Sequence, residues 1–342
     1  MILFKKYHKI PQYRGVVKSI CSVADFKGLD EEGVAIYVDS EKPVLTAKGH
    51  VKLHGTNALI SYTPTDGLQA GKRKSLVGKD SLRAHFMFNQ FVQVTKKDTL
   101  IEIMDTLWRE HCVEGEQITL YGEWAGNGVQ KGVGISLLPK SFFVFDCKKT
   151  NLDTDESEWI DIEGLRFPSI DNMYNIDEFP TFEVEIDFNK PALIQNRLVE
   201  ITNQVEKDCP VAKQLLGETD KELVGEGVVW RFFWKGQKYI FKVKGEKHST
   251  SKVKKLAQID PEVLKSINEF VEYACTENRI NQGIQEVDAK SKSDTRDLVS
   301  WVSRDIIKEE SDVLKASGLT YKQVAKSCSK VIVNHFFKTL NL

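Results

Sequence analysis

The segment Lys52-Leu53-His54-Gly55-Thr56-Asn57 decides the fold of this 342-residue chain, and it stands at the end of an expected strand. In an extended backbone, Lys52 and His54 point to one face and Leu53 to the other. Gly55 permits a tight turn, or the close approach of a phosphate to the backbone. By itself this pattern is typical of a surface lysine and histidine beside a turn. Whether these residues carry chemistry therefore depends on the motifs elsewhere in the chain.

Length and composition limit the possibilities. A chain of 342 residues exceeds what one core usually holds, so we expect one large and one small domain. The 48 basic and 49 acidic residues give a net charge of −1, which argues against a polycation that coats nucleic acid. No apolar run approaches the ~20 residues that span a bilayer, and no secretion signal is visible. We therefore expect a cytoplasmic protein with no membrane partner.

The six cysteines form no C-x-x-C pair and are spread along the whole chain. Structural zinc sites usually need such pairs, so none is expected. Scattered free thiols are typical of a reducing compartment. The cysteines therefore favour the same cytoplasmic location.

The first 250 residues are predicted to mix strands and helices, and the remainder to be helical. A hairpin is expected over residues 228–243, and a single helix over residues 85–107. Further strands are expected at 33–38, 59–62, 118–121 and 141–145. This mixture favours an α+β fold with antiparallel sheets.

Beyond residue 250 the pattern changes to helical spacing of apolar residues. A polar stretch at 249–252 is predicted to be a linker, and helices are expected from Pro261 onward. Their apolar faces are predicted to hold residues 263, 267, 270 and 271, and then 298, 302, 306 and 307. Gly318 is expected to close one helix and Thr320 to cap the next. The predicted domains are therefore residues 1–250 and 251–342.

Two motifs place a carboxylate or an aromatic residue at a strand end. Glu123 lies in the sequence YGEWAGNG, before a glycine-rich loop, although such loops are common. The run FFVFD covers residues 142–146, and Phe142 and Val144 are expected in the core. Phe145 and Asp146, at the expected exit of this strand, could line a pocket in which an aromatic ring stacks on a base.

Two further motifs carry charge. Glu226 lies between two glycines and leads into an apolar strand, which is unusual for a purely structural strand. Lys242 and Lys244 lie on one face of an expected strand, with Phe241 and Val243 on the other. Such a strand is either a solvated edge or a site for a polyphosphate.

In this order, the five motifs resemble those of the covalent nucleotidyltransferases, the polynucleotide ligases and mRNA capping enzymes. The K-x-H-G-x-N form resembles the RNA ligase 2 family, which includes phage RNA ligases and the kinetoplastid RNA-editing ligases. The tail runs ENRIN (277–281) and RDIIKEE (304–310) resemble elements of its helical C-terminal domain. The resemblance implies a nucleotidyltransferase domain of ATP-grasp-like antiparallel sheets with helices, followed by a small all-helical domain.

The resemblance implies an ATP-dependent RNA ligase that uses Mg²⁺ or Mn²⁺. Lys52 would attack the α-phosphate of ATP and form a lysyl-AMP, and the AMP would then pass to the 5′-phosphate of RNA. Glu226 would help to hold the metal, and Glu123 would bind the ribose hydroxyls. Arg279 and Asp305 would assist transfer to the RNA end, or they could only pair on helix surfaces. The other residues expected to hold the nucleotide are His54, Gly55, Asn57, Arg73, Phe145, Asp146, Lys242 and Lys244.

One position departs from the family pattern. Phage relatives often carry a glutamate just before the lysine, where it can read adenine, whereas this chain has Val51. Adenine recognition is therefore expected to depend on backbone groups and Phe145. Residues 151–222 show no usable motif.

The expected partner is RNA with 5′-phosphate and 3′-OH ends, as in a nicked duplex, bound by a monomer in the cytoplasm, including that of a phage-infected cell. A DNA ligase or a mixed-polymer nick ligase is the nearest alternative. A capping enzyme is disfavoured because K-x-D-G and a β-rich tail are missing. A non-catalytic RNA-binding relative is a different alternative, which the intact charged motifs oppose.

Overall fold

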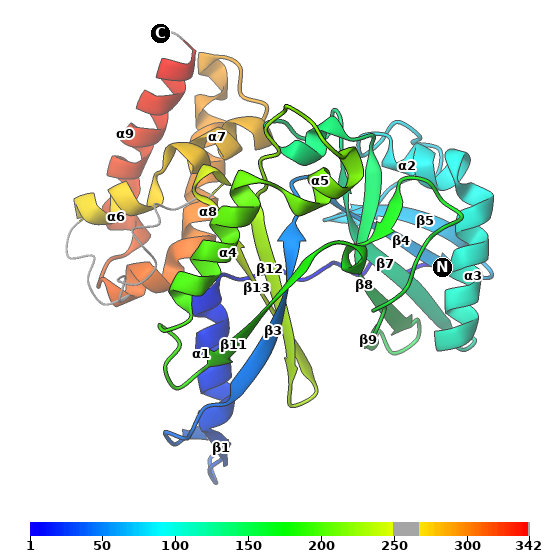
Figure 1. Ribbon diagram of the computed structural model, residues 1–342. Helices are drawn as coiled ribbons and strands as arrows, with labels where there is room; N and C mark the ends of the chain where they lie inside the picture. The colour runs from blue at the N-terminus through cyan, green and yellow to red at the C-terminus, as the bar shows by residue number, and fades with distance from the viewer. Residues whose placement is uncertain (249–266, 341–342) are drawn as a thin grey trace. The chain divides into compact units, whose positions relative to one another are not determined.

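The computed structural model describes residues 1–248 and 267–340 (Figure 1). Its chain separates into two compact units. The sheet unit comprises Met1–Pro191 and Ile201–Val243, and the helical unit comprises Ala192–Glu200 and Lys244–Leu342. The predicted linker at 249–252, the predicted domain boundary and Val263 lie outside the described residues.

The larger sheet of the sheet unit runs in the order β10-β8-β7-β4-β5-β6, with β9 paired to β8. Its strand pairs are antiparallel except for β10 and β8, which run parallel. The expected strands at 59–62, 118–121 and 141–145 all lie within it. The strands are β4 (Thr56–Thr63), β5 (Gly67–Lys72), β6 (Ser75–Leu76), β7 (Glu116–Ala125), β8 (Ser141–Asn151), β9 (Ser157–Ile160) and β10 (Met173–Asn175).

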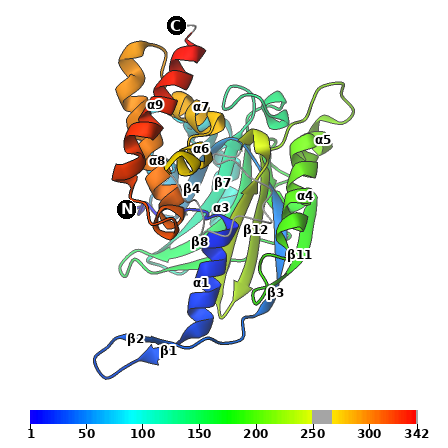
Figure 2. The same ribbon diagram turned by 90° about the vertical axis from the view of Figure 1, so that its left-hand side faces the viewer.

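The smaller sheet runs in the order β11-β3-β12-β13. It contains the expected hairpin as β12 and β13, joined through Lys235 and Gly236. A separate hairpin of β1 and β2 projects beyond the end of α1 (Figure 2). The strands are β1 (Phe26–Leu29), β2 (Ala35–Tyr37), β3 (Val44–Lys52), β11 (Thr181–Asp187), β12 (Gly227–Trp234) and β13 (Gln237–Lys244).

A core of the sheet unit lies between the larger sheet and α3, which packs along β4, β5 and β7 (Figure 1). Alternation along β4 sends Ala58, Ile60 and Tyr62 into this core, while Leu59 packs on the opposite face against Tyr121. The helices within residues 1–248 are α1 (Tyr13–Asp25), α2 (Phe88–Gln90), η1 (Phe91–Thr95), α3 (Lys97–His111), η2 (Gly134–Leu137), η3 (Ile176–Glu178), α4 (Gln195–Lys207), α5 (Pro210–Leu216) and η4 (Glu246–His248).

The chain crosses from one sheet to the other within the deciding segment. Lys52 is the last residue of β3 and pairs with Gly227 of β12, in the smaller sheet. Four residues later Thr56 begins β4, and Asn57 pairs with Glu123 of β7 in the larger sheet. The segment Leu53-His54-Gly55 is therefore the connection that brings the ends of both sheets together.

The prediction of a single helix over residues 85–107 is wrong. His85, Phe86 and Met87 have left-handed φ angles of 54°, 55° and 71°, so no helix runs through them. The indole N–H of Trp124 holds this turn by donating to the carbonyl of Phe86 at 3.2 Å. The chain continues as α2 and the π-helical η1, breaks at Lys96, and resumes as α3. Tertiary contacts have overridden the apolar spacing.

The helical unit contains α6 (Ile267–Ala274), α7 (Glu277–Glu286), η6 (Lys292–Asp294), α8 (Thr295–Ala316) and α9 (Tyr321–Thr339). Its core confirms the helical spacing, since Phe270, Leu298, Val302 and Ile306 are buried. Ile307 is 44% exposed, so its predicted place in the core is wrong. It stands one residue, or about 100° around the helix, beyond the buried face.

The predicted fold class is confirmed: an α+β unit with antiparallel sheets is followed by helices. Gly318 ends α8 with a φ of 64°, and Thr320 forms a capping box with Gln323 at the start of α9, both as expected. Among residues 1–248 and 267–340, no helix has both the length and the apolar character needed to cross a bilayer. All six cysteines are free thiols.

Candidate active site

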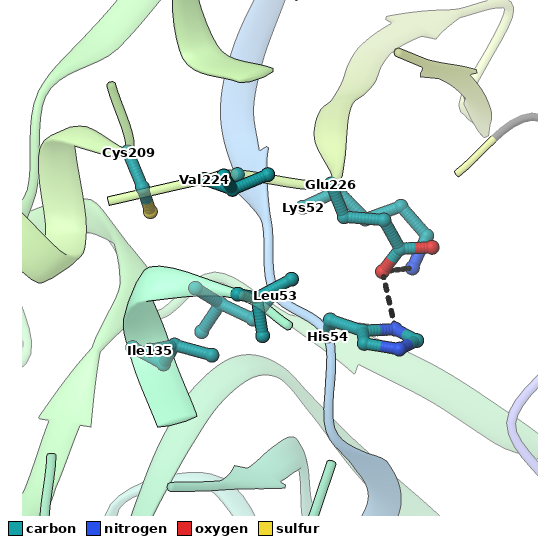
Figure 3. Close-up of a pocket in the computed structure, with 9 residues that line it drawn as sticks. Lys52, Leu53, His54, Ile135, Cys209, Val224 and Glu226 are labelled. Atoms are coloured by element: carbon teal, nitrogen blue, oxygen red, sulfur yellow. Dashed lines mark hydrogen bonds and ion pairs between the residues drawn. The ribbon is translucent and has the colours of Figure 1, made fainter. Parts of the chain in front are cut away.

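A lysine, a histidine and a buried carboxylate meet where β3 leaves the smaller sheet (Figure 3). Lys52 Nζ donates to Glu226 Oε2 at 2.6 Å, and His54 Nδ1 lies 3.3 Å from the same oxygen. The Glu226 side chain is 2% exposed, whereas those of Lys52 and His54 are 20% and 28% exposed. The carboxylate is therefore fixed in the protein, while the lysine can be reached from solvent.

These three residues form the polar side of a small recess. The predicted alternation is confirmed in Figure 3, where Leu53 points away from His54 and toward Ile135. The apolar side is lined by Leu53, Val133, Ile135, Cys209 and Val224. An apolar wall next to a charged group weakens the screening by water and strengthens the interaction of that group with a neighbouring charge.

Glu123 joins this arrangement from β7. Its Oε1 accepts a hydrogen bond from the backbone N–H of Gly55 at 3.0 Å. Burial raises the pKa of Glu123 from 4.5 to about 7, and the Glu226 carboxylate adds to the increase, while Lys52 and the Gly55 N–H oppose it. A carboxyl group that titrates near neutral pH beside a lysine is typical of a functional site.

Close packing of the backbone, and not only a phosphate contact, explains why position 55 is a glycine. A Cβ at this position would stand 2.4 Å from the carbonyl oxygen of Trp124 and 2.8 Å from the Cβ of Ala125. The glycine therefore lets the connection pass against the backbone of β7. This close approach places its N–H on Glu123 and fixes the turn that follows Lys52.

Asn57 and Arg73 occupy different surroundings. The backbone carbonyl of Asn57 contacts Nε2 of His85 at 3.0 Å, and its side-chain Oδ1 is buried without a partner among the described residues. A buried amide oxygen of this kind is suited to a ligand or to water. Arg73 is exposed in the turn between β5 and β6. Its role rests on the resemblance alone.

Phe145 and Asp146 do not stand at the exit of a strand, as the sequence had predicted, because β8 continues to Asn151. Instead, the pairing of β8 with β7 shifts by one residue at Phe145. Such a bulge redirects the side chain at that position. Phe145 packs edge-on against Tyr7 with ring centroids 5.0 Å apart, and it is partly exposed.

Asp146 is held in a buried cluster, with a side chain that is 6% exposed. Tyr7 donates its hydroxyl to Asp146 Oδ2 at 2.5 Å, and Lys238 forms an ion pair with Oδ1. Arg231 donates to the backbone carbonyl of Phe145 at 3.2 Å. Asp146, through Lys238, and Phe145, through Arg231, therefore tie β8 of the larger sheet to β13 and β12 of the smaller sheet.

Lys242 and Lys244 lie on β13, and both are partly exposed. Phe241 and Val243 are buried, which confirms the predicted alternation. The backbone N–H of Lys242 donates to the carbonyl of Pro11 at 3.0 Å, which joins the N-terminal segment to this strand. The side chains of the two lysines thus share the face opposite the core.

Sequence reasoning missed a second buried pair. His50 lies two residues before Lys52 on the same face of β3, and its Nε2 is 2.6 Å from Asp177 Oδ1. Burial lowers the pKa of His50, and that of Asp177 is also lowered because His50, Arg231 and Lys48 outweigh burial. The alternation of Lys48, His50 and Lys52 could have revealed His50. Asp177 lies in the stretch without motifs, so no signal pointed to it.

Arg279 and Asp305 pair with each other, but inside the helical unit. The Arg279 side chain is 0% exposed, and its Nε donates to Asp305 Oδ2 at 2.9 Å. Its other nitrogens donate to Glu310 Oε1 at 2.8 Å and to the carbonyl of Ala274 at 2.6 Å. Tyr273 donates to the second oxygen of Glu310 at 3.0 Å. In this arrangement the guanidinium binds α7 to α8 and to the end of α6.

The sequence profile of the RNA ligase family matches residues 49–244, more than half of the chain. The chain belongs to the RNA ligase family. The matched region includes the segment from Lys52 to Asn57, Glu123, Glu226 and the lysines of β13. A search among curated proteins by sequence found no match.

Solved structures of an RNA ligase from Naegleria gruberi are similar to this RNA ligase family member. The ligase with PPi is 12% identical, with a TM-score of 0.43 over 71% of this chain and 56% of that chain. A lysine-to-methionine variant with AMP and Mn is 13% identical, with a TM-score of 0.43 over 70% and 56%. This chain thus spans a little over half the length of those ligases.

Proposed function

We propose that this member of the RNA ligase family is an ATP-dependent ligase that joins a 3′-OH to a 5′-phosphate of RNA. The observation that supports this most strongly is the convergence of three distant motifs. Lys52 contacts Glu226 at 2.6 Å, and the connection that follows Lys52 contacts Glu123 at 3.0 Å. A reachable lysine between two carboxylates, one of them with a pKa of about 7, is suited to covalent catalysis.

In the first step, the Lys52 amine attacks the α-phosphate of ATP. A phosphorus–nitrogen bond forms as the bond to pyrophosphate breaks. The amine must give up its proton before attack, and Glu226 Oε2 at 2.6 Å is the base within reach. Phosphoryl transfer otherwise needs positioning and charge neutralisation. Lys242 and Lys244, on one face of β13, supply positive charge for the α-phosphate.

The larger sheet would hold the nucleoside. Phe145, redirected by its bulge, would stack on adenine, and the Asp146 cluster would keep that bulge in place. Glu123 would bind the ribose hydroxyls. His54 and Asn57 would orient the triphosphate, with Gly55 fixing the turn between them. Val51 stands where phage relatives often carry a glutamate, so the selection of the base would depend on Phe145 and backbone groups.

The residues present fit a divalent ion held mainly by its substrate. Among the described residues, no three histidine, cysteine or acidic side chains form a cluster that could hold a metal alone. Mg²⁺ is commonly bound through one or two carboxylates, phosphate oxygens and water. Glu226 would provide the carboxylate for Mg²⁺ or Mn²⁺. When bound, the ion would neutralise charge on the phosphates.

Two later steps would complete the reaction. The AMP passes from Lys52 to the 5′-phosphate of RNA, breaking the phosphorus–nitrogen bond and forming a phosphoanhydride. The RNA 3′-OH then attacks that phosphate, sealing the strand and releasing AMP. Arg73, exposed in its turn, would contact the AMP or the RNA 5′-phosphate. Arg279 and Asp305 would assist by holding the helical unit in shape.

The first step can be tested without RNA. The protein is incubated with α-labelled ATP and Mg²⁺, denatured, and examined for bound label. Lys52→Ala should abolish the label, while Lys48→Ala, which removes a lysine from the same face of β3, should keep it. Label that is labile in acid and stable in alkali would establish the phosphorus–nitrogen bond.

The same preparation separates the alternatives. Sealing of nicks with RNA or DNA 3′-OH strands, compared with single-stranded ends, defines the substrate. Gel filtration checks the proposed monomer. Absence of label with ATP, GTP and NAD alike would contradict the ligase proposal and leave a binding protein.

A further inference from the structure

One face of the last helix, α9, carries only positive charge. The chain as a whole is nearly neutral, with 48 basic and 49 acidic residues. The sequence of α9, YKQVAKSCSKVIVNHFFKT, holds four lysines and no aspartate or glutamate. The preceding helix α8, TRDLVSWVSRDIIKEESDVLKA, mixes four basic residues with five acidic ones. The absence of acidic residues therefore belongs to α9 and not to the helical unit in general.

The four lysines are arranged regularly. Lys322, Lys326 and Lys330 follow one another at intervals of four residues, and Lys338 continues the row after Asn334. The side chains of these four lysines and of Asn334 are all exposed. The first four of these residues along the chain each stand two positions before a buried residue. Lys338 stands two positions after the last of the buried residues, which are Val324, Cys328, Ile332 and Phe336. Two positions correspond to a rotation of about 200°, so the row points away from the core.

The opposite face of α9 is already occupied. It packs against α6, α7 and α8 (Figure 2). Its apolar residues are therefore committed to the core of the helical unit, where all four are at most 1% exposed. A helix that binds a membrane surface needs an exposed apolar face beside its lysines, whereas Val331, 37% exposed, is the one exposed large apolar side chain among the described residues of α9. This favours a partner that is hydrophilic and negatively charged.

Within residues 1–248 and 267–340, the four lysines have no acidic partner. Among the described residues, none of the ion pairs includes Lys322, Lys326, Lys330 or Lys338. By contrast, Lys290 in the same unit pairs with Asp288 at 2.7 Å. Lys322, Lys326 and Lys330 are about 6 Å apart along the helix axis, and Lys338 lies about 12 Å beyond Lys330. A nucleic-acid strand offers a phosphate about every 3.4 Å of duplex axis, within the reach of such side chains.

We infer that the lysine row of α9, formed by Lys322, Lys326, Lys330 and Lys338, docks on the phosphate backbone of the RNA substrate. This inference rests on the proposed function, because it takes RNA as the polyanion. The row gives affinity without reading sequence, since phosphate contacts position a protein but do not identify bases. It would supply locally the positive charge that the neutral chain lacks overall.

The test uses the full-length protein and a nicked RNA duplex with a 5′-phosphate, without ATP. The variant K322Q/K326Q/K330Q is compared with K190Q/K290Q/K315Q, which removes the same charge from exposed lysines elsewhere. The Kd is measured between 50 and 200 mM salt. Losing three phosphate contacts should weaken binding about 10–100-fold at 100 mM salt and reduce the slope of log K against log salt by about 2–3. The control should bind like the unmodified protein, and K322R/K326R/K330R should retain binding.

Adduct formation with ATP alone separates this inference from the proposed function. The row variant should form the adduct like the unmodified protein, because no residue of α9 takes part in the proposed first step. If the unmodified protein forms no adduct, the proposed function fails. If it forms the adduct but both triple variants bind RNA equally, or if only binding to phosphatidylserine vesicles is lost, the docking inference is overturned.

Discussion

Two clusters of charged side chains, one in each unit, both combine a basic residue with buried carboxylates and differ in the exposure of that basic residue. In the sheet unit, Lys52 shares the Glu226 carboxylate with His54, and the lysine side chain is 20% exposed. In the helical unit, Arg279 shares Asp305 and Glu310, and both Arg279 and Glu310 are 0% exposed. Motif resemblance had marked residues of both clusters for chemistry.

The difference in burial indicates different roles. A charge with no exposed surface can bind only the groups already packed around it, and its value lies in holding them together. A lysine that solvent can reach beside a fixed carboxylate can exchange its partner for a substrate. The first cluster is therefore suited to reaction and the second to structure, although a motif cannot distinguish them.

The largest expected effect concerns the buried cluster. Arg279→Met leaves Glu310 and Asp305 without their shared cation, and breaking a buried pair in this way costs about 3–5 kcal/mol. Urea unfolding followed by circular dichroism measures the loss. Lys290→Met, which breaks a pair with side chains 76% and 78% exposed, should leave the unfolding curve unchanged. Equal behaviour of the two variants would remove the contrast between the clusters.

A third cluster sharpens the comparison, because it is buried yet lies in the sheet unit. Tyr7→Phe removes the hydroxyl that donates to Asp146 at 2.5 Å, while the ion pair with Lys238 remains. A lost hydrogen bond to a charged group costs about 1.5–3 kcal/mol, so the loss should be smaller than for Arg279→Met. Tyr37→Phe, at a tyrosine that is 56% exposed, is the control. Unchanged stability of Tyr7→Phe would show that Asp146 needs only Lys238.

The smallest stability effect is expected at the reactive cluster, and it depends on pH. The pKa of Glu123 rises from 4.5 to about 7 on folding, so the folded state holds this proton more tightly than the unfolded state. Stability should then decrease as the pH rises from about 4.5 to about 7. Glu123→Gln removes this dependence, and it should raise the free energy of unfolding by about 1–2 kcal/mol at pH 8.

Urea unfolding at pH 5 and pH 8 provides the check. At pH 5 Glu123 is already protonated in the folded state, so the variant and the unmodified protein should differ little. A variant that loses stability at pH 8 would mean that the carboxylate is held there by favourable contacts. Glu123 would then resemble the structural cluster and not the reactive one.

The sequence predicted the parts of the site that depend on local pattern. Lys52 ends a strand, Leu53 and His54 point apart, and Phe241 and Val243 alternate with the lysines of β13, as period-two spacing requires. The order of the motifs also predicted the family. These features are set by residues close to one another in the chain.

Features that depend on distant contacts were not predictable. The turn at His85–Met87 depends on the indole of Trp124, and the bulge at Phe145 depends on the pairing of β8 with β7. Asp177 reaches His50 across 127 positions of sequence. The burial of Arg279 depends on α6 and α8 together. In each case the decisive partner lies in another element of structure, which spacing along one segment does not encode.

The contrast between the clusters is tested most directly by one pair of matched variants, Glu226→Gln and Glu310→Gln, measured for both adduct formation with ATP and thermal unfolding. Glu226→Gln should reduce adduct formation by at least about 100-fold and lower the melting temperature less than Glu310→Gln does, because its partner Lys52 is 20% exposed. Glu310→Gln should form the adduct at the unmodified rate and lower the melting temperature by several degrees. The opposite result, an active Glu226→Gln and a stable but inactive Glu310→Gln, would contradict the assignment of chemistry to the sheet unit.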